Sequence, residues 1–169
     1  MKVTDEKLEL SALHNPNNYH ISDLESEMAV DRLCTALLKK FHHYLLQERR
    51  LEPLEAGSQA AGADYFLHEF MIGKLRRNIF HASADDVRKF AGHWYIISNL
   101  EPNMAELNSM LAGTASFYRY CAEHQLTPLT TAEEIADTCR QSKYFQQRIE
   151  DFHNITGAGY NAWEQACPL

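Results

Sequence analysis

The stretch LNSMLAGTASFYRYCAEHQL, residues 107–126, decides the fold class. Its apolar side chains recur every third or fourth residue, which is the period of one face of an α-helix. The residues on that face are Leu107, Met110, Leu111, Thr114, Phe117, Tyr118 and Cys121. We therefore expect a helix here, and we expect it to be the most deeply buried helix of the chain.

The same period recurs on both sides of this stretch. It predicts a helix from residue 22 to about residue 50, a second over 64–80, a third that begins at residue 83, and a long last helix from residue 131. The residues expected to face inward are Val30, Cys34, Leu37, Phe41, Leu45, Phe66, Leu67, Phe70, Met71, Leu75, Ile79, Val87, Phe90, Ala91, Trp94, Ile97, Ile135, Cys139, Ile149 and Phe152. Because no segment alternates with the two-residue period of a strand, the sequence predicts an all-α multi-helix bundle.

Short polar motifs predict where these helices begin, since an N-cap side chain accepts a backbone N–H from two or three residues further on. The pairs with this spacing are Ser22 with Glu25, Ser83 with Asp86, Asn103 with Glu106, and Thr131 with Glu134. Glycine and proline predict the breaks. Residues 52–62, EPLEAGSQAAG, are expected to form a linker.

The expected organisation follows from these boundaries. It is a poorly ordered leader over 1–21, an N-terminal helix over 22–56, a helical core over 63–127, and a C-terminal helix and tail over 129–169 that pack on the core. The tail contains Trp163, which we expect to pack back onto the bundle as an aromatic plug.

Composition and charge limit the class of protein. The chain is 45% hydrophobic with a formal net charge of −7, which favours a globular protein and argues against one that coats nucleic acid without selectivity. No segment reaches the roughly eighteen apolar residues of a membrane span, and the first ten residues lack the apolar core of a secretory signal. We therefore expect a cytoplasmic protein that does not enter a membrane. The four cysteines, Cys34, Cys121, Cys139 and Cys167, are widely spaced and include no C-x-x-C pair, so no disulfide framework is expected. Three of them lie in predicted helices, where a buried reduced thiol acts as a small apolar filler.

Residues 74–90, KLRRNIFHASADDVRKF, hold five of the sixteen lysine and arginine residues of this acidic chain. This basic cluster consists of Lys74, Arg76, Arg77, Arg88 and Lys89. Two interpretations stay open. The cluster binds phosphate groups with salt-sensitive affinity, or it is the solvated rim of two helices, neutralised by Glu69, Asp85, Asp86 and water.

Two tyrosines near the cluster also have two interpretations. Tyr95 and Tyr120 lie off the predicted inward faces of their helices. Exposed aromatic side chains beside a basic cluster suit a surface that binds a partner. The alternative is that both fill the core.

Residues 64–126 resemble the N-terminal, SAM-like core-binding domain of tyrosine recombinases and phage integrases. The stretches that carry the resemblance are YFLHEFM (65–71), SADDVRKFAGHW (83–94) and LNSMLAGTASFYRYCAEHQL (107–126). The resemblance implies a helical clamp that lies against DNA, with the basic cluster on phosphates. The Arg, His-x-x-Arg and Tyr of recombinase catalysis have no matching segment after residue 126, so no catalysis is implied.

A metal site requires ligands that meet at one point. Glu150 and His153 have the Glu-x-x-His spacing of a di-iron bundle, but the sequence contains no second pair of this kind. Asp64 and His68, four residues apart, fit either a ligand pair or a surface hydrogen bond. We therefore expect no metal and no cofactor, with Glu150 and His153 as the weak alternative.

No catalytic constellation is complete. Cys121 and His124 share a helix, but Cys121 lies on the apolar face, where burial suppresses thiol reactivity. GAGYNA, residues 157–162, fits G-x-G-x-x-A, but a predicted helix precedes it instead of the strand that a dinucleotide fold requires, so we expect its glycines to cap that helix.

The sequence therefore predicts a non-enzymatic helical protein that binds another protein or a second copy of itself. The alternatives are an accessory DNA-binding protein related to recombinase core-binding domains, which the net acidity disfavours, and a helical metal-binding oxidoreductase.

Overall fold

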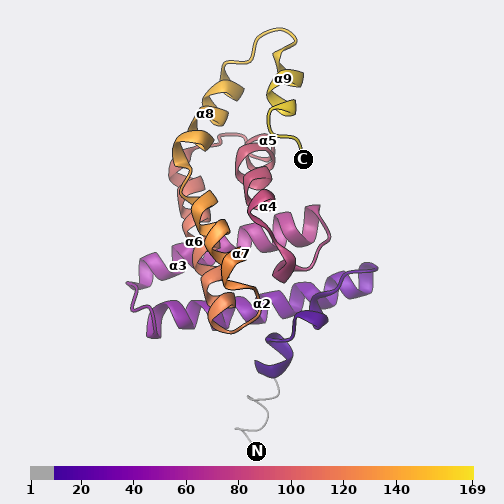
Figure 1. The fold of residues 1–169 in the computed structure, drawn as a ribbon, viewed down its shortest axis with the longest axis vertical. Helices are drawn as coiled ribbons and strands as arrows, with labels where there is room; N and C mark the ends of the chain where they lie inside the picture. The colour runs from indigo at the N-terminus through magenta and orange to yellow at the C-terminus, as the bar shows by residue number, and fades with distance from the viewer. Residues whose placement is uncertain (1–9) are drawn as a thin grey trace, which may run out of the picture.

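The computed structural model describes residues 10–169, and Figure 1 shows that this part of the chain is built from helices. The α-helices are α2 (Leu24–Gln47), α3 (Pro53–Asp64), α4 (Ala84–Lys89), α5 (Tyr95–Ser98), α6 (Met104–Glu123), α7 (Leu129–Cys139), α8 (Ser142–His153) and α9 (Gly159–Gln165). Two π-helical segments, η2 (Tyr65–Lys74) and η4 (Phe90–Trp94), continue α3 and α4, and short 3₁₀ turns lie at η1 (Pro16–Tyr19) and η3 (Ile79–His81). The range 10–169 contains no strand, so the prediction of an all-α bundle is confirmed. None of its helices is both long and apolar enough to cross a bilayer.

Two layers of helices form the body of the molecule. In Figure 1, α2 and the continuous helix α3–η2 run side by side across the molecule, while α6 and α7 run along its length. Helix α6 contacts α3, α7 and α8, and η4 contacts α8. Helices α8 and α9 extend at the end of the molecule opposite the N-terminus.

The helix over 107–126 is buried as the sequence predicts. All seven residues of the predicted face are buried, with exposed fractions of 8% or less. Tyr118 is fully covered and donates a hydrogen bond from its hydroxyl to the carbonyl oxygen of Ile79 at 2.7 Å. This bond satisfies the one polar atom of a side chain that is otherwise core filling.

The predicted linker over 52–62 is wrong, because these residues form most of α3. A Cβ added to Gly62 would lie 2.6 Å from the carbonyl oxygen of Ser109 on α6, and one added to Gly113 would lie closer still to the carbonyl oxygen of Gln59 on α3. The two glycines therefore let α3 and α6 cross with their backbones in contact. Gly62 serves helix packing, and its lack of a side chain does not mark a break in the chain.

Two of the four predicted N-caps are confirmed and two are wrong. Ser83 and Asn103 accept the backbone N–H of the residue three positions later. The first helix is capped by Asp23 with Ser26, one residue beyond the predicted pair Ser22 and Glu25. The pair Thr131 and Glu134 lies inside α7, which begins directly after Pro128, a residue whose fixed φ suits the start of a helix.

The predicted long last helix is two helices. The chain breaks at Arg140–Gln141, between α7, which packs on α6 and α4, and α8, which packs on η4 and α9. Ile135, Cys139 and Ile149 are buried as predicted, and Phe152 is half-buried.

The predicted leader is packed where the structure describes it, over residues 10–21, and residues 1–9 lie outside the described range. Tyr19 is fully buried against Phe80, with ring centres 4.7 Å apart, and its hydroxyl donates to the carbonyl oxygen of Leu13. Asn78 donates to the carbonyl oxygen of Pro16. The prediction of a poorly ordered segment is therefore wrong for residues 10–21, because the turn places an aromatic ring in the core.

The π-helical segment η4 changes which residues of its helix face the core. The backbone N–H of Tyr95 donates to the carbonyl oxygen of Phe90, five residues back, so this turn holds one residue more than an α-helical turn. Beyond it the inward positions are taken by Tyr95 and Ile96, while Trp94 is half-buried and Ile97 is 39% exposed. The inward prediction for Ile97 is therefore wrong.

The second predicted helix also ends early. It runs to Lys74 instead of residue 80, and the chain turns at Arg76, whose φ is 52°. Leu75 and Ile79 still pack on the core, but Ile79 does so from the 3₁₀ turn η3.

Candidate functional site: a groove between α6 and α7

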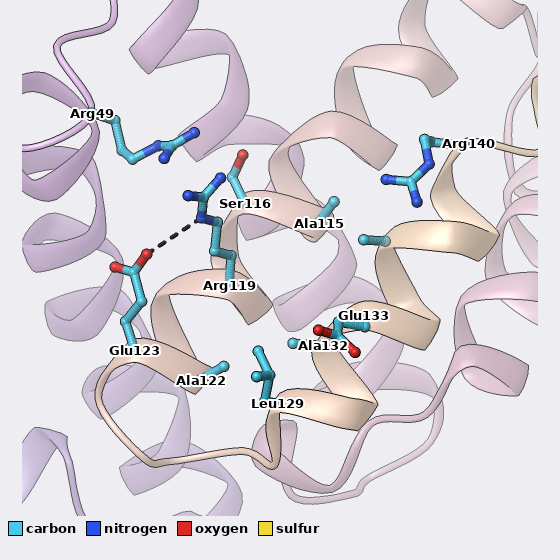
Figure 2. A pocket seen from close by; sticks show the side chains of 11 residues that line it. Arg49, Ala115, Ser116, Arg119, Ala122, Glu123, Leu129, Ala132, Glu133 and Arg140 are labelled. Carbon is cyan, nitrogen blue, oxygen red and sulfur yellow. Dashed lines mark hydrogen bonds and ion pairs between the residues drawn. The ribbon is translucent and has the colours of Figure 1, made fainter.

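A groove of about 660 Å³ lies between α6 and α7, on the side that faces the end of α2. Small side chains line it: Ala115, Ala122, Ala132 and Ala136. Leu129, the first residue of α7, is 65% exposed at one end. Figure 2 shows labelled alanines from both helices facing the opening, with Leu129 at one end. The site therefore offers an apolar floor bounded by two helices.

Charged side chains stand around this floor. Arg49 and Arg119 lie on one side of the groove and Arg140 on the other (Figure 2). Arg119 pairs with Glu123 on its own helix at 3.3 Å, and Arg140 pairs with Asp137. The lining residues include three arginines and two glutamates, a net charge of +1 on a chain that carries −7, and two of the three arginines are already in ion pairs.

The short connection between Glu123 and Leu129 makes the groove. Five residues turn the chain so that α7 packs back on α6. The alanines lie seven residues apart on α6 and four apart on α7, so each helix presents only small side chains along the groove. Sequence reasoning missed this site because it followed the large apolar residues. The available signal was the alanine spacing beside Arg119 and Arg140.

The basic cluster is largely engaged in ion pairs. Arg76 pairs with Glu27 at 3.1 Å, Arg77 with Asp86 at 2.8 Å, and Arg88 and Lys89 both with Asp85 at 3.2 and 3.1 Å. Lys74 is exposed. These pairs agree with the interpretation of a neutralised rim, except that Glu27 from α2 takes the place expected for Glu69. Phosphate binding by the cluster stays a prediction.

Tyr95 and Tyr120 are buried, so the interpretation of a partner surface is wrong for both. The Tyr95 hydroxyl accepts the backbone N–H of Asn103 and donates to its carbonyl oxygen, both at 3.1 Å. Tyr120 is 3% exposed, packs against Phe41 and Tyr44 of α2, and hydrogen-bonds to Nε2 of His14 at 2.6 Å. Both fill the core, the alternative that the sequence left open.

Glu150 and His153 are exposed, and Glu150 accepts a hydrogen bond from Gln146. Over residues 10–169, no three His, Cys, Asp or Glu side chains lie close enough together to hold a metal ion. The glycines of GAGYNA do not cap α8, because Asn154 does. Gly157, with φ of 56°, instead lies in the turn that leads to α9.

His68 forms the densest polar cluster outside the groove. Its Nδ1 lies 2.5 Å from the Asp64 carboxylate, and its Nε2 lies 3.5 Å from the Asp31 carboxylate and 3.3 Å from the Thr35 hydroxyl. The hydrogen bond to Asp64 raises the pKa of His68 to about 11. The cluster ties η2 to α2, because His68 lies on η2 whereas Asp31 and Thr35 lie on α2.

The four cysteines are buried and free, as expected for Cys34, Cys121 and Cys139, and Cys167 of the tail is buried as well. Burial raises the pKa of Cys34 and Cys121, and raises that of Cys139 to about 12. These thiols therefore remain protonated and poorly nucleophilic at neutral pH.

Comparisons of the chain with protein-family models, with curated proteins and with solved structures find no match. The resemblance of residues 64–126 to recombinase core-binding domains therefore stays a prediction.

Proposed function

We propose that this protein is a non-catalytic helical binding protein that holds an acidic amphipathic helix of a partner protein in the groove between α6 and α7. The observation that carries the proposal is an apolar groove bounded by three arginines on an otherwise acidic chain.

The shape of the groove supports a helix as the occupant. Two packed helices present a channel between their ridges, and a third helix fits such a channel with its side chains interdigitated. The alanines allow the backbone of the partner to approach closely, and Leu129 supplies an exposed contact for an apolar anchor residue. Helix-in-groove recognition uses apolar anchors three or four residues apart.

The charges support acidic flanks on that helix. Arg49 and Arg119 stand on one side of the floor and Arg140 on the other, so carboxylates on both edges of the apolar face of a partner would meet an arginine. Such pairs at the rim of an interface mainly set partner choice and association rate, while the apolar floor supplies affinity.

The test is selection from a library of helical peptides with randomised flanks around a leucine-containing apolar face. We expect enrichment of Asp and Glu in the flanks, and chemical-shift changes at the backbone amides of Ala115 and Ala132 when a selected peptide is added. The variant A136W, at a half-buried alanine of the groove, fills the floor and should abolish binding. L24E alters a leucine as exposed as Leu129, at the end of α2 opposite Arg49, and should leave binding unchanged.

Charge reversal gives the sharper control. In R119E/R140E, the same selection should enrich Lys and Arg. Unchanged preference in this variant, or shifts confined to residues outside the groove, contradicts the proposal. If the groove instead holds a second copy of this chain, the protein dimerises as its concentration rises and A136W abolishes the dimer. That outcome overturns the partner proposed here.

A further inference from the structure

A few polar contacts hold residues 157–169, which we call the strap, against α8 and η4. The strap consists of α9 and the residues that flank it. The Trp163 indole N–H donates to the carbonyl oxygen of Arg148 at 2.9 Å, and Nη1 of Arg148 donates to the carbonyl oxygen of Trp163 at 2.7 Å. The centre of the guanidinium lies 4.0 Å from the centre of the Trp163 ring. A further bond joins Nδ1 of His93, on η4, to the carbonyl oxygen of Cys167 at 2.7 Å.

The strap buries little apolar surface. Trp163 and Cys167 are its only buried residues, and each is 5% exposed. Its helix α9 packs on α8, whereas α6 is buried along one whole face against several elements. Because stabilisation by burial follows the apolar area removed from water, two side chains supply most of what keeps the strap closed. The free energy that holds the strap in place is therefore a small part of the free energy that keeps the rest of the molecule folded.

Closing the strap leaves two polar atoms without partners. Nε2 of His93 and Nη2 of Arg148 are the only buried side-chain nitrogen or oxygen atoms of residues 10–169 that make no hydrogen bond. Both belong to side chains that bond to the strap. No carboxylate in the same range lies within ion-pair distance of Arg148. A buried cation without a counter-charge and a buried unpaired polar atom each destabilise the state that buries them. Opening the strap removes this penalty, because water then reaches both side chains.

We propose that the strap opens and closes as a unit while residues 10–156 stay folded. Opening gives up the burial of two side chains and in return hydrates the guanidinium of Arg148 and the imidazole of His93. Gly157 suits the hinge, because its φ is 56°, which glycine adopts without strain, and nothing lies within 4 Å of an added Cβ. The strap is thus a conformational element at the end of the molecule formed by α8 and α9, separate from the groove between α6 and α7.

The buried cysteines report the opening, because a thiol reacts with iodoacetamide only when it is exposed. Cys167 lies in the strap, whereas Cys34 and Cys121 lie in α2 and α6 and are fully buried. Without urea, we expect Cys167 to be alkylated at least about 100-fold faster than Cys121, measured at each site by mass spectrometry. The rate at Cys167 should change little with urea below the global transition, since opening exposes little surface, while the rates at Cys34 and Cys121 should rise steeply.

Two variants of α9 test what holds the strap. W163A removes the ring that covers the guanidinium and the hydrogen bond from its indole N–H. It should speed the alkylation of Cys167 at least about tenfold, because a large buried side chain is lost, and should leave the rate at Cys121 unchanged. Y160A is the matched control, since Tyr160 is an aromatic residue of the same helix that is 40% exposed. It should change the rate at Cys167 less than about threefold.

The proposal is overturned if Cys167 and Cys121 react at the same rate with the same dependence on urea, because the strap would then open only with the whole molecule. An unchanged rate at Cys167 in W163A, or an equal acceleration in Y160A, also overturns it, since Trp163 would then not hold the strap. If W163A does not fold, the comparison of Cys167 with Cys121 in the parent protein still decides.

Discussion

At the scale of single residues, burial decides how much an ion pair contributes to the free energy of unfolding. The basic cluster contains one pair with a buried carboxylate and one pair that is exposed. Asp86 is 4% exposed, accepts the backbone N–H and hydroxyl of Ser83, and pairs with Arg77. Asp85 is exposed and pairs with Arg88. Removing Arg77 leaves a buried carboxylate without its cation, whereas removing Asp86 lets the half-exposed Arg77 turn to water.

We therefore expect R77M to lower the free energy of unfolding by about 3 kcal/mol, and D86N to lower it by about 1–2 kcal/mol through weaker hydrogen bonds at the helix cap. The double variant R77M/D86N should lose less stability than the sum of the losses in R77M and D86N. In the exposed pair, R88M and D85N should each change stability by less than about 1 kcal/mol. Urea unfolding of the variants of both pairs measures these values. Equal losses of stability in the buried pair and the exposed pair contradict the argument.

At the scale of elements, the crossing of α3 and α6 depends on two backbones in contact. Alanine at Gly113 would push its methyl group into the carbonyl of Gln59, so the helices must separate along a packed interface. We expect G113A to lower the free energy of unfolding by about 3 kcal/mol. Gly57 lies in the same α3 with nothing within 4 Å of an added Cβ. There alanine should raise stability by about 0.5–1 kcal/mol, because glycine is a poor helix former.

Thermal and urea unfolding of G113A and G57A check the crossing. A G113A variant as stable as the parent would show that α3 and α6 are not held at this distance. A destabilised G57A would show that residue 57 is not an open position of α3. The same comparison tests why residues 52–62 form a helix although their glycines predict a linker.

At the scale of the whole molecule, two histidines at separate contacts give opposite slopes of stability with pH. The pKa of His68 is raised to about 11, first by the hydrogen bond to Asp64, so its stabilisation is complete below 6.5 and is lost as pH rises towards 11. The pKa of His14 is lowered by burial and then by His124, whose ring centre lies 4.7 Å away. Its contribution is present above 6.5 and is lost as pH falls below that value, because the unfolded chain binds the proton more readily.

Stability should therefore pass through a maximum near pH 6.5 as far as these two groups decide it. H68Q should flatten the fall between pH 7 and 10, and H14Q the fall below pH 6.5, in urea unfolding measured across the range. H153Q, at an exposed histidine, is the control and should leave the profile unchanged. A parent profile without an alkaline fall would show that His68 is not held as an ion pair.

The prediction from sequence succeeded where one regular period decides the outcome. The seven residues on the buried face of α6, and the five on that of α2, are read directly from three- and four-residue steps. It failed where a turn changed the period. The sequence left open whether Tyr95 fills the core, because an α-helical count carried through η4 puts it off the inward face. The extra residue of that turn brings it inside.

The candidate sites follow the same division. The groove was missed because alanines give little periodic signal, and the burial of Arg148 was missed because nothing local marks an arginine as buried. Arg148 becomes a buried cation only when Gly92, 56 positions earlier in the chain, and Trp163, in the tail, close over it.

The sequence by itself determined the helical class, the inward faces of α2 and α6, and the caps at Ser83 and Asn103. These depend on interactions between residues a few positions apart, whose energies the local sequence contains. Only the tertiary structure decided that Gly62 packs on the backbone of α6 and Gly113 on that of α3, that Tyr120 is covered by α2 and His14, and that a groove stays open between α6 and α7. Those outcomes depend on which distant helices come into contact, and an amphipathic face specifies only that it will be buried, without specifying against which partner.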